Sequence, residues 1–397
     1  MSRLSYLTVL REPHVVRSFI PSIIGRLSLA TSGLALVLLL EQSTRSFAIA
    51  GIVTAALGIA NVVVTPWRAR LIDHRGQALP LAALGLVHAA SLVALGLLTD
   101  AGLPFLLCLS VVAGASSPPF GASMRVLWSA ALPAGARRTR GFSLDAVAEE
   151  LTFAVGPLVA ALLALLVDPL ASLILSASCV AVGTVFFVTS PLSRQQHGSR
   201  AVIETHLAPA LTPLRTKGFL PIVVAMTAPG VVLGCIEIAA PAVASTESNT
   251  LLAGILLALF AGASAVGGLL YGRREVKARP ERQLIILTLV LLATTAATGL
   301  IGGVAAALVG FALSGLCLAP LLIVGYLAAD ARTDHRVRTE SSSWINTAVN
   351  LGAALGAAVF GLLSDATGPG HALAITAALA AGIIVVCSPF LRGEPSV

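Results

Sequence analysis

The sequence predicts an all-α membrane protein with twelve transmembrane helices, arranged as two pseudo-symmetric bundles of six. Three observations support this fold class: an apolar composition, twelve long apolar segments, and basic residues confined almost entirely to alternate loops. The chain is 57% apolar and 11% charged, with a mean hydropathy of +0.94, whereas soluble domains are about 45–50% apolar and about 25% charged. This composition excludes a disordered chain and collagen, and the unbroken apolar segments exclude an outer-membrane β-barrel.

Twelve apolar segments are long enough for a helix to cross the hydrocarbon core, which takes about 20 residues. The first is too long for the apolar core of a signal peptide and lacks a small-residue cleavage site, so we expect it to remain as a helix. In order, the predicted spans are Phe19–Leu40, Phe47–Pro66, Leu79–Leu98, Leu103–Met124, Leu144–Val167, Leu170–Thr189, Phe219–Ala244, Leu251–Tyr271, Leu284–Ile301, Val304–Tyr326, Ser342–Leu363 and Ala372–Phe390.

Basic residues mark one side of the predicted membrane. Of the 25 lysines and arginines, all but Arg26 and Arg45 lie in the terminal segments or in the loops on the same side as the termini; we call this the basic side. Because cytoplasmic loops retain positive charge, we expect a multi-pass protein of the cytoplasmic membrane with both termini in the cytoplasm. This asymmetry accounts for the net charge of +7, so no nucleic-acid partner is expected.

The residue types of metal, disulfide and nucleotide sites do not occur at the required spacings. The five cysteines all fall in apolar segments without a CxxC pair, which favours small buried side chains over a metal site or a disulfide framework. No GxxxxGK[ST] phosphate loop is present. We therefore expect no cofactor and no metal. The expected partners are a small-molecule substrate, protons and the lipid bilayer, and we expect a monomer.

The chain divides into two similar halves. We expect an N-terminal six-helix bundle over residues 1–190, a central cytoplasmic loop over 191–218, and a C-terminal six-helix bundle over 219–397. Gly114 and Pro119 in the fourth span recur 201 residues later as Gly315 and Pro320 in the tenth. Parallel repeats of this kind are a transporter architecture, with the substrate site at the interface between the halves.

The turn after the second span carries a motif. Transporters of the major facilitator superfamily have a GxxxDRxGRR turn there; in this chain Asp73 and Gly76 match it and Arg75 is displaced by one position, while Ala69 and His74 replace a glycine and an arginine. With twelve spans and a six-plus-six repeat, the whole chain resembles this superfamily. The resemblance implies a transporter that works by alternating access, with a cavity between spans 1, 4, 7 and 10.

The resemblance also implies that this turn gates the inward side. The candidate gating residues are Arg70, Asp73, Arg75 and Gly76. The Asp73 carboxylate could lie at the positive N-terminus of span 11, where residues 341–343, three serines, could provide the N-cap. The alternative is an ordinary charged loop.

Ionisable residues inside spans are costly and are by default functional candidates. Arg26 and Glu149 lie at matching depths, roughly 12–14 Å from the basic side at 1.5 Å per residue, so we expect Arg26 to pair with Glu149 or Glu150, with Glu149 preferred. Asp145 precedes Glu149 by four residues, and like charges at this spacing repel. A carboxylate that exchanges a proton as Arg26 approaches suits a proton-coupled antiporter; the alternative is a fixed ion pair.

The substrate cavity has four candidate residues. Glu237 lies in a span broken by prolines and could select cationic substrates, although it could instead reach water at the outer interface. Asn346, Asn350 and Trp344 in span 11 could add amide and aromatic contacts. His88 in span 3 is more simply a packing residue than a proton relay.

Span 5 carries Gly156 and Pro157, half of the GxxxGPxxGG signature of exporters; small residues replace its other glycines and keep close helix packing possible. The sequence therefore predicts a proton-coupled exporter of small organic compounds or drugs, conferring multidrug resistance. An importer or facilitator of a sugar, amino acid or organic ion needs the same architecture. An integral-membrane transferase acting on lipid substrates is the alternative of another class; a transporter of this kind is not an enzyme.

Overall fold

The computed structural model describes residues 6–196, 213–246, 250–273 and 278–391. Twelve of the described helices are long and apolar enough to cross a membrane, which confirms the predicted fold class. Most of the predicted central loop, residues 197–212, lies outside the described residues.

Ten spans are single helices and two are pairs. The single helices are α2 (Val15–Thr44), α3 (Phe47–Arg75), α4 (Ala78–Leu97), α7 (Ala136–Leu166), α8 (Pro169–Thr189), α13 (Thr250–Arg273), α14 (Pro280–Ile301), α15 (Gly303–Arg332), α16 (Arg338–Thr367) and α17 (Pro369–Leu391). The fourth span consists of α5 (Leu103–Ser116) and α6 (Phe120–Ala131), and the seventh of α11 (Phe219–Ala225) and α12 (Thr227–Thr246). The short helices α1 (Tyr6–Leu10), α9 (Pro191–Gln195) and η2 (Pro213–Arg215) lie outside the spans, and η3 (His335–Val337) directly precedes α16 at the start of the eleventh.

Several helices begin at residues that favour helix starts. The Ser46 hydroxyl accepts a hydrogen bond from the backbone N–H of Ile49 at the start of α3. Asp168 does the same for α8, where its carboxylate lies 2.7 Å from the N–H of Leu170 and Pro169 occupies the first helical position. Both arrangements satisfy an amide that has no intrahelical acceptor.

Contacts divide the chain into two compact units. The first comprises residues 1–133, 151–206 and 338–343, and the second comprises 134–150, 207–337 and 344–397. This division follows the two sequence halves except at the start of α7, which packs with the second unit, and the start of α16, which packs with the first. These two helices are spans 5 and 11, which correspond in the repeat.

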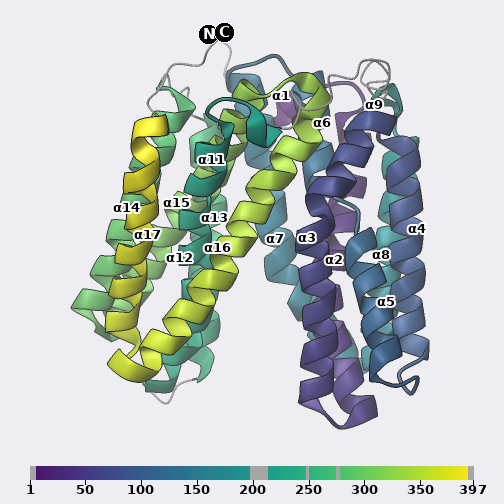
Figure 1. Ribbon diagram of the computed structural model, residues 1–397, viewed down its shortest axis with the longest axis horizontal. Coiled ribbons are helices and arrows are strands. Elements are labelled where there is room, and N and C mark those ends of the chain that lie inside the picture. The colour runs from purple at the N-terminus through teal and green to yellow at the C-terminus, as the bar shows by residue number, and fades with distance from the viewer. Residues whose placement is uncertain (1–5, 197–212, 247–249, 274–277, 392–397) are drawn as a thin grey trace. The chain divides into compact units, whose positions relative to one another are not determined.

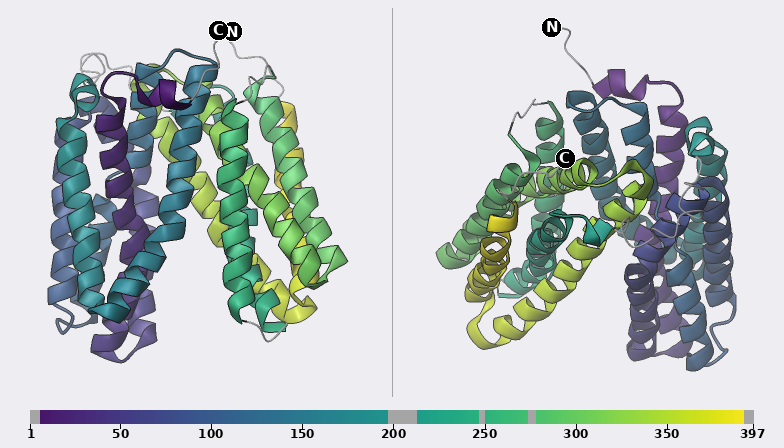
Figure 2. Two further views of the ribbon diagram at one scale, coloured as in Figure 1. Left: turned by 180° about the vertical axis from the view of Figure 1, so that it is seen from behind. Right: turned by 45° about the horizontal axis from the view of Figure 1, so that its top comes forward.

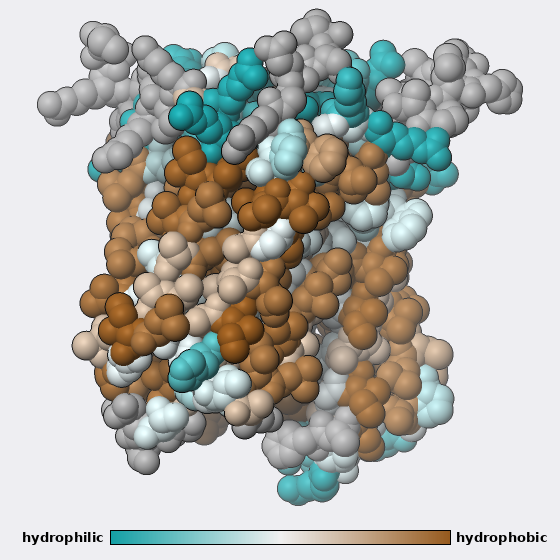
Figure 3. Space-filling view, turned by 60° about the vertical axis from the view of Figure 1, so that its left-hand side comes forward, coloured by the Kyte–Doolittle hydropathy of each residue, from teal (hydrophilic) through white to brown (hydrophobic). Residues whose placement is uncertain are grey.

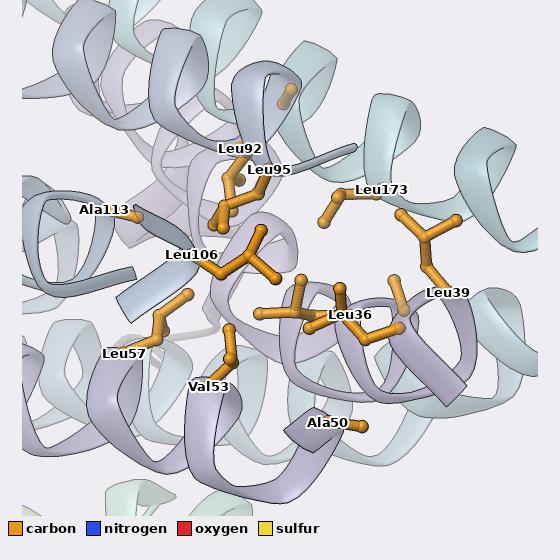
Figure 4. Packing of buried hydrophobic residues seen from close by; sticks show 13 residues of the cluster. Leu36, Leu39, Ala50, Val53, Leu57, Leu92, Leu95, Leu106, Ala113 and Leu173 are labelled. Carbon is orange, nitrogen blue, oxygen red and sulfur yellow. The ribbon is translucent and has the colours of Figure 1, made fainter. Parts of the chain in front are cut away.

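The first unit is built around α2, which packs most extensively against α8. A cluster of buried leucines at one end joins α2, α3, α4, α5 and α8, with Leu36, Leu92 and Leu106 almost completely buried (Figure 4). Gly183 of α8 lies against the backbone of Gly25 in α2, where a Cβ at position 183 would be 2.5 Å from the Gly25 nitrogen. Figures 1 and 2 show these long helices side by side.

In the second unit, α15 packs against α13 and α14, and α14 against α17. Glycines bring α12 and α16 together: Gly234 lies against the carbonyl of Ala353, and Gly356 against the carbonyl of Val231. A Cβ at position 234 or 356 would be 1.8 or 2.0 Å from those oxygens. Gly230 and Gly352 make similar contacts one turn earlier on each helix, so pairs of glycines four residues apart allow close backbone contact.

We expect Gly356→Leu to lower the thermal stability of the purified protein, because the added side chain would overlap the Val231 carbonyl; overpacking of this kind costs about 1–3 kcal/mol. Thermal unfolding in detergent measures the effect. Gly361→Leu on the same helix is the matched control, since no atom lies within 4 Å of a Cβ there. Equal melting temperatures for the two variants would contradict the packing argument.

Apolar side chains cover the membrane-facing surface. Leu165, Leu300 and Leu362 are 81%, 71% and 77% exposed. Figure 3 shows apolar residues across the middle of one face, with hydrophilic residues gathered toward its upper edge. A helix that exposes such side chains along its length requires hydrocarbon around it.

Candidate functional site

The Asp73 carboxylate lies at the N-terminus of α16. One oxygen, Oδ1, accepts a hydrogen bond from the backbone N–H of Thr339 at 3.2 Å, and Oδ2 accepts one from Glu340 at 2.9 Å. These amides belong to the first turn of the helix and have no intrahelical acceptor. The sequence placed Asp73 at this helix, but the helix starts before the three serines, so residues 339 and 340 provide the contact.

Arg70 strengthens this contact. Its Nε and Nη2 donate to the two carboxylate oxygens of Glu340 at 3.1 and 2.7 Å, a bidentate ion pair. The Glu340 side chain is only 2% exposed. Asp73 and Arg70 on α3 therefore hold adjacent groups at the start of α16; Glu340 was not among the residues predicted from the sequence.

The other two residues of the candidate gating motif shape the turn. Gly76 ends α3 with φ +84°, a region that favours glycine. Arg75, the last residue of α3, is exposed. In the turn that follows, the Gln77 side chain donates to the carbonyl of Ser123 at 3.1 Å.

The start of α7 makes a comparable contact in the second unit. Arg138 forms an ion pair with Asp330 near the end of α15, with 2.7 Å between Nη1 and Oδ2, and both side chains are largely buried. A second ion pair joins Arg332 to Glu281 of α14 at 2.8 Å. All four residues lie near helix ends on the basic side, and none of them was predicted as a site residue from the sequence.

The candidate proton-coupling residues lie on two helices. Arg26 on α2 is 6% exposed and belongs to the first unit. Asp145 is completely buried on α7, and Glu149 and Glu150 are half-buried one turn further along that helix; all three belong to the second unit. The pairing of Arg26 with Glu149 or Glu150 therefore stays a prediction.

The candidate cavity residues are spread over α12 and α16. Glu237 is exposed on α12. Asn346 of α16 accepts a hydrogen bond through Oδ1 from the hydroxyl of Tyr326 on α15, and Trp344 is half-buried near it in sequence. Asn350, one turn after Asn346, is exposed. Their role in substrate binding stays a prediction.

Gly156 of α7 lies against α2, where a Cβ at this position would be 2.5 Å from the Cβ of Ala30. Spans 1 and 5 are therefore neighbours within the first unit. Pro157 follows within α7, which continues to Leu166. The contact agrees with the small-residue packing predicted for this part of span 5.

Arg68 serves a role that was not predicted from the sequence. Predicted as a loop residue, it lies within α3, 4% exposed, and its Nη1 donates to the carbonyls of Gly114 and Ala115 at 2.8 and 3.3 Å. In a continuous helix these carbonyls would accept from residues 118 and 119, which are prolines without an N–H. The break between α5 and α6 thus leaves these two carbonyls without their usual i+4 donors. Arg68 donates to both of them, and Gly114 also accepts from the N–H of Ser117.

His88 completes this arrangement. Its Nδ1 lies 2.7 Å from the carbonyl of Ala113, the residue just before Gly114 in the last turn of α5. In a continuous helix the Ala113 carbonyl would accept from the N–H of Ser117, but this N–H donates to the carbonyl of Gly114. His88 therefore has a structural bond, as expected for a packing residue, and the paired prolines are the signal that could have pointed to Arg68.

We expect Arg68→Met to destabilise the protein by about 2 kcal/mol, because the carbonyls of Gly114 and Ala115 would lose the hydrogen bonds that Arg68 donates. Thermal melting in detergent tests this, with the exposed Arg75→Met on the same helix as the control. In a double variant, Pro119→Ala should recover part of the loss by returning a helical N–H. A loss equal to that of the control would contradict this account.

Comparison with known proteins identifies the family. The sequence model of the Major Facilitator Superfamily matches residues 19–323 and again 238–397. The chain belongs to the major facilitator superfamily. It is therefore an integral, multi-pass transporter rather than an enzyme, which removes the alternative of a membrane transferase. A search of curated proteins found no match for the sequence.

Solved structures of this superfamily share the fold. The human organic anion transporter MFSD10 (TETRAN) aligns with a TM-score of 0.74 and 15% identity, covering 96% of this chain and 100% of that chain. A bacterial homologue of the iron transporter ferroportin has a TM-score of 0.73 and 13% identity, with coverage of 95% and 99%. The fucose:proton symporter of E. coli has a TM-score of 0.72 and 14% identity, with coverage of 96% and 100%.

Proposed function

We propose that this transporter exports small organic compounds, drugs among them, across the cytoplasmic membrane in exchange for protons. The observation that carries the proposal is the group of carboxylates on α7: Asp145 is completely buried, and Glu149 and Glu150 follow within the same span. Ionisable groups at such depth are retained at a cost and commonly move protons. The proton passes to and from Glu149 as Arg26 approaches and withdraws.

The contacts on the basic side support alternating access. Asp73 and Arg70 join span 2 to the start of span 11, and Arg138 joins the start of span 5 to the end of span 10. Each contact links the two sequence halves. A substrate path that opens between the halves on this side requires these contacts to release, so they act as a reversible latch.

The orientation follows from charge. The basic side faces the cytoplasm, since basic loops are retained there, so both termini are cytoplasmic and the latch closes the inner side. We expect a monomer to suffice, because each chain carries both halves of the repeat.

The substrate is expected to be cationic or neutral and amphipathic. Glu237 is an exposed carboxylate within a span and would select cations, while Asn346, Asn350 and Trp344 would add amide and aromatic contacts. An importer or facilitator of a sugar, amino acid or organic ion is the second candidate, and the likeness to a fucose:proton symporter favours testing it.

Purified protein in proteoliposomes that contain a pH-sensitive dye tests the proposal. Cationic, neutral and anionic compounds are added in turn, and proton movement is recorded with substrate flux. Export by antiport predicts proton movement opposite to the flux of a cationic compound. Movement in the same direction as the substrate would show a symporter, and flux without proton movement would show a facilitator.

A further inference from the structure

A groove opens between α3, α4 and α5 in the first unit. It encloses about 570 Å³, within the range of about 300–1,000 Å³ that small-molecule sites occupy. Its walls are formed mainly by apolar side chains, including Leu71, Leu79, Val87 and Val112, and Ser116 lines it at the end of α5. The groove is therefore apolar along most of its length.

The groove faces outward from the first unit. Leu79, Val87 and Val112 are 74%, 45% and 44% exposed, and α4 packs against α8 and against α5, which forms another wall of the groove. Figure 1 shows α4 at the edge of this unit. Within a transmembrane span, such an exposed apolar surface lies against lipid chains.

One end of the groove carries a positive charge. Among the described residues that line it, Arg75, the last residue of α3, is the one charged residue, and none is a carboxylate. From Leu79 to Val87 the wall extends about 12 Å along α4 at 1.5 Å per residue. The groove thus has a cation at the level of the lipid head groups and an apolar channel that leads into the hydrocarbon.

We propose that this groove binds an anionic phospholipid, with the phosphate on the Arg75 guanidinium and one acyl chain along the wall formed by Leu79 and Val87. A guanidinium binds phosphate oxygens through charge-assisted hydrogen bonds. An anionic lipid keeps its net negative charge for Arg75, whereas in a zwitterionic lipid the ammonium of the head group compensates the phosphate. The charge at the groove therefore favours the anionic lipid.

A tryptophan beside the groove can report the bound lipid. Trp67, Leu71 and Arg75 follow one another at intervals of four residues on α3, so they lie on one face of the helix, and Trp67 is 59% exposed. Bromine atoms on an acyl chain quench the fluorescence of a tryptophan that they contact. Trp128 is completely buried, and a Trp67→Phe variant gives the background of the remaining tryptophans.

The protein is reconstituted into phosphatidylcholine vesicles that contain either brominated phosphatidylglycerol or the same fraction of brominated phosphatidylcholine. We expect half-maximal quenching of Trp67 at an about five-fold lower fraction of the anionic lipid, which is the effect of one arginine at a membrane surface. Arg75→Gln, which removes the charge, and Ala83→Phe, which fills the groove, should both abolish the difference. Arg17→Gln, another exposed arginine on the basic side, should preserve it.

Equal quenching by the two lipids in the wild-type protein would overturn the proposal. So would an anionic preference that persists in Arg75→Gln, since the phosphate would then lie elsewhere. Quenching by neither lipid would show that something else covers the groove, and cross-linking between chains at position 83 would then identify a second copy as its occupant.

Discussion

Replacing Asp73 with asparagine is expected to slow transport at least about ten-fold without reducing the amount of folded protein in the membrane. The carboxylate accepts the N–H groups of Thr339 and Glu340 at the start of α16, and hydrogen bonds to a charged group contribute about 1.5–3 kcal/mol each. An asparagine amide has one acceptor oxygen and no charge, so one bond and the interaction with the helix dipole are lost. About 1.4 kcal/mol changes the ratio of two conformations ten-fold.

The measurement is the initial rate of substrate transport in vesicles, normalised to the amount of inserted protein. Asp334→Asn is the matched control, because this exposed carboxylate lies shortly before the same helix and contacts only local groups among those described, the N–H of Arg336 and the imidazole of His335. Glu340→Gln should weaken transport in the same way, since it removes the ion pair with Arg70. Unchanged kinetics in Asp73→Asn would show that the contact is not a latch.

The span count and the segments that form the spans were predictable from the sequence, because a transmembrane helix must satisfy its backbone internally and expose apolar side chains. The residues at which the spans end were harder to predict. The second span was predicted to end at Pro66, but α3 continues to Arg75, since a helix can extend past the hydrocarbon into the interface. That extension moves Arg68 and Arg70 from a loop onto a helix.

The candidate site could be predicted only in part. The motif pointed to Asp73 and its partner helix, because a carboxylate is stabilised by the positive N-terminal end of a helix. Glu340 and Asp330 were missed because their partners Arg70 and Arg138 are far away in sequence. Arg68 was missed because it replaces hydrogen-bond donors that are absent: Pro118 and Pro119, between α5 and α6, have no N–H, and they are far from Arg68 in sequence.

The exchange of Glu149 for glutamine is expected to abolish transport driven by a pH gradient. Asp145 and Glu149 lie four residues apart on α7 and share a face, and Asp145 is completely buried. Glutamine preserves the size of the side chain and resembles the protonated acid in having a donor and an acceptor, but it cannot release a proton. Glu41→Gln is the matched control and should leave transport intact. It makes the same chemical change near the end of α2 that is farther from the basic side.

In the proposed antiport mechanism, Glu149 carries the coupled proton. The most direct measurement compares two rates in the same proteoliposomes: exchange of labelled for unlabelled substrate without a pH gradient, and substrate movement driven by a pH gradient. We expect Glu149→Gln to retain exchange, because a carrier that has substrate bound during both its inward and outward movements needs no proton release. We expect the same variant to lose the gradient-driven rate. Full gradient-driven transport in Glu149→Gln would contradict it.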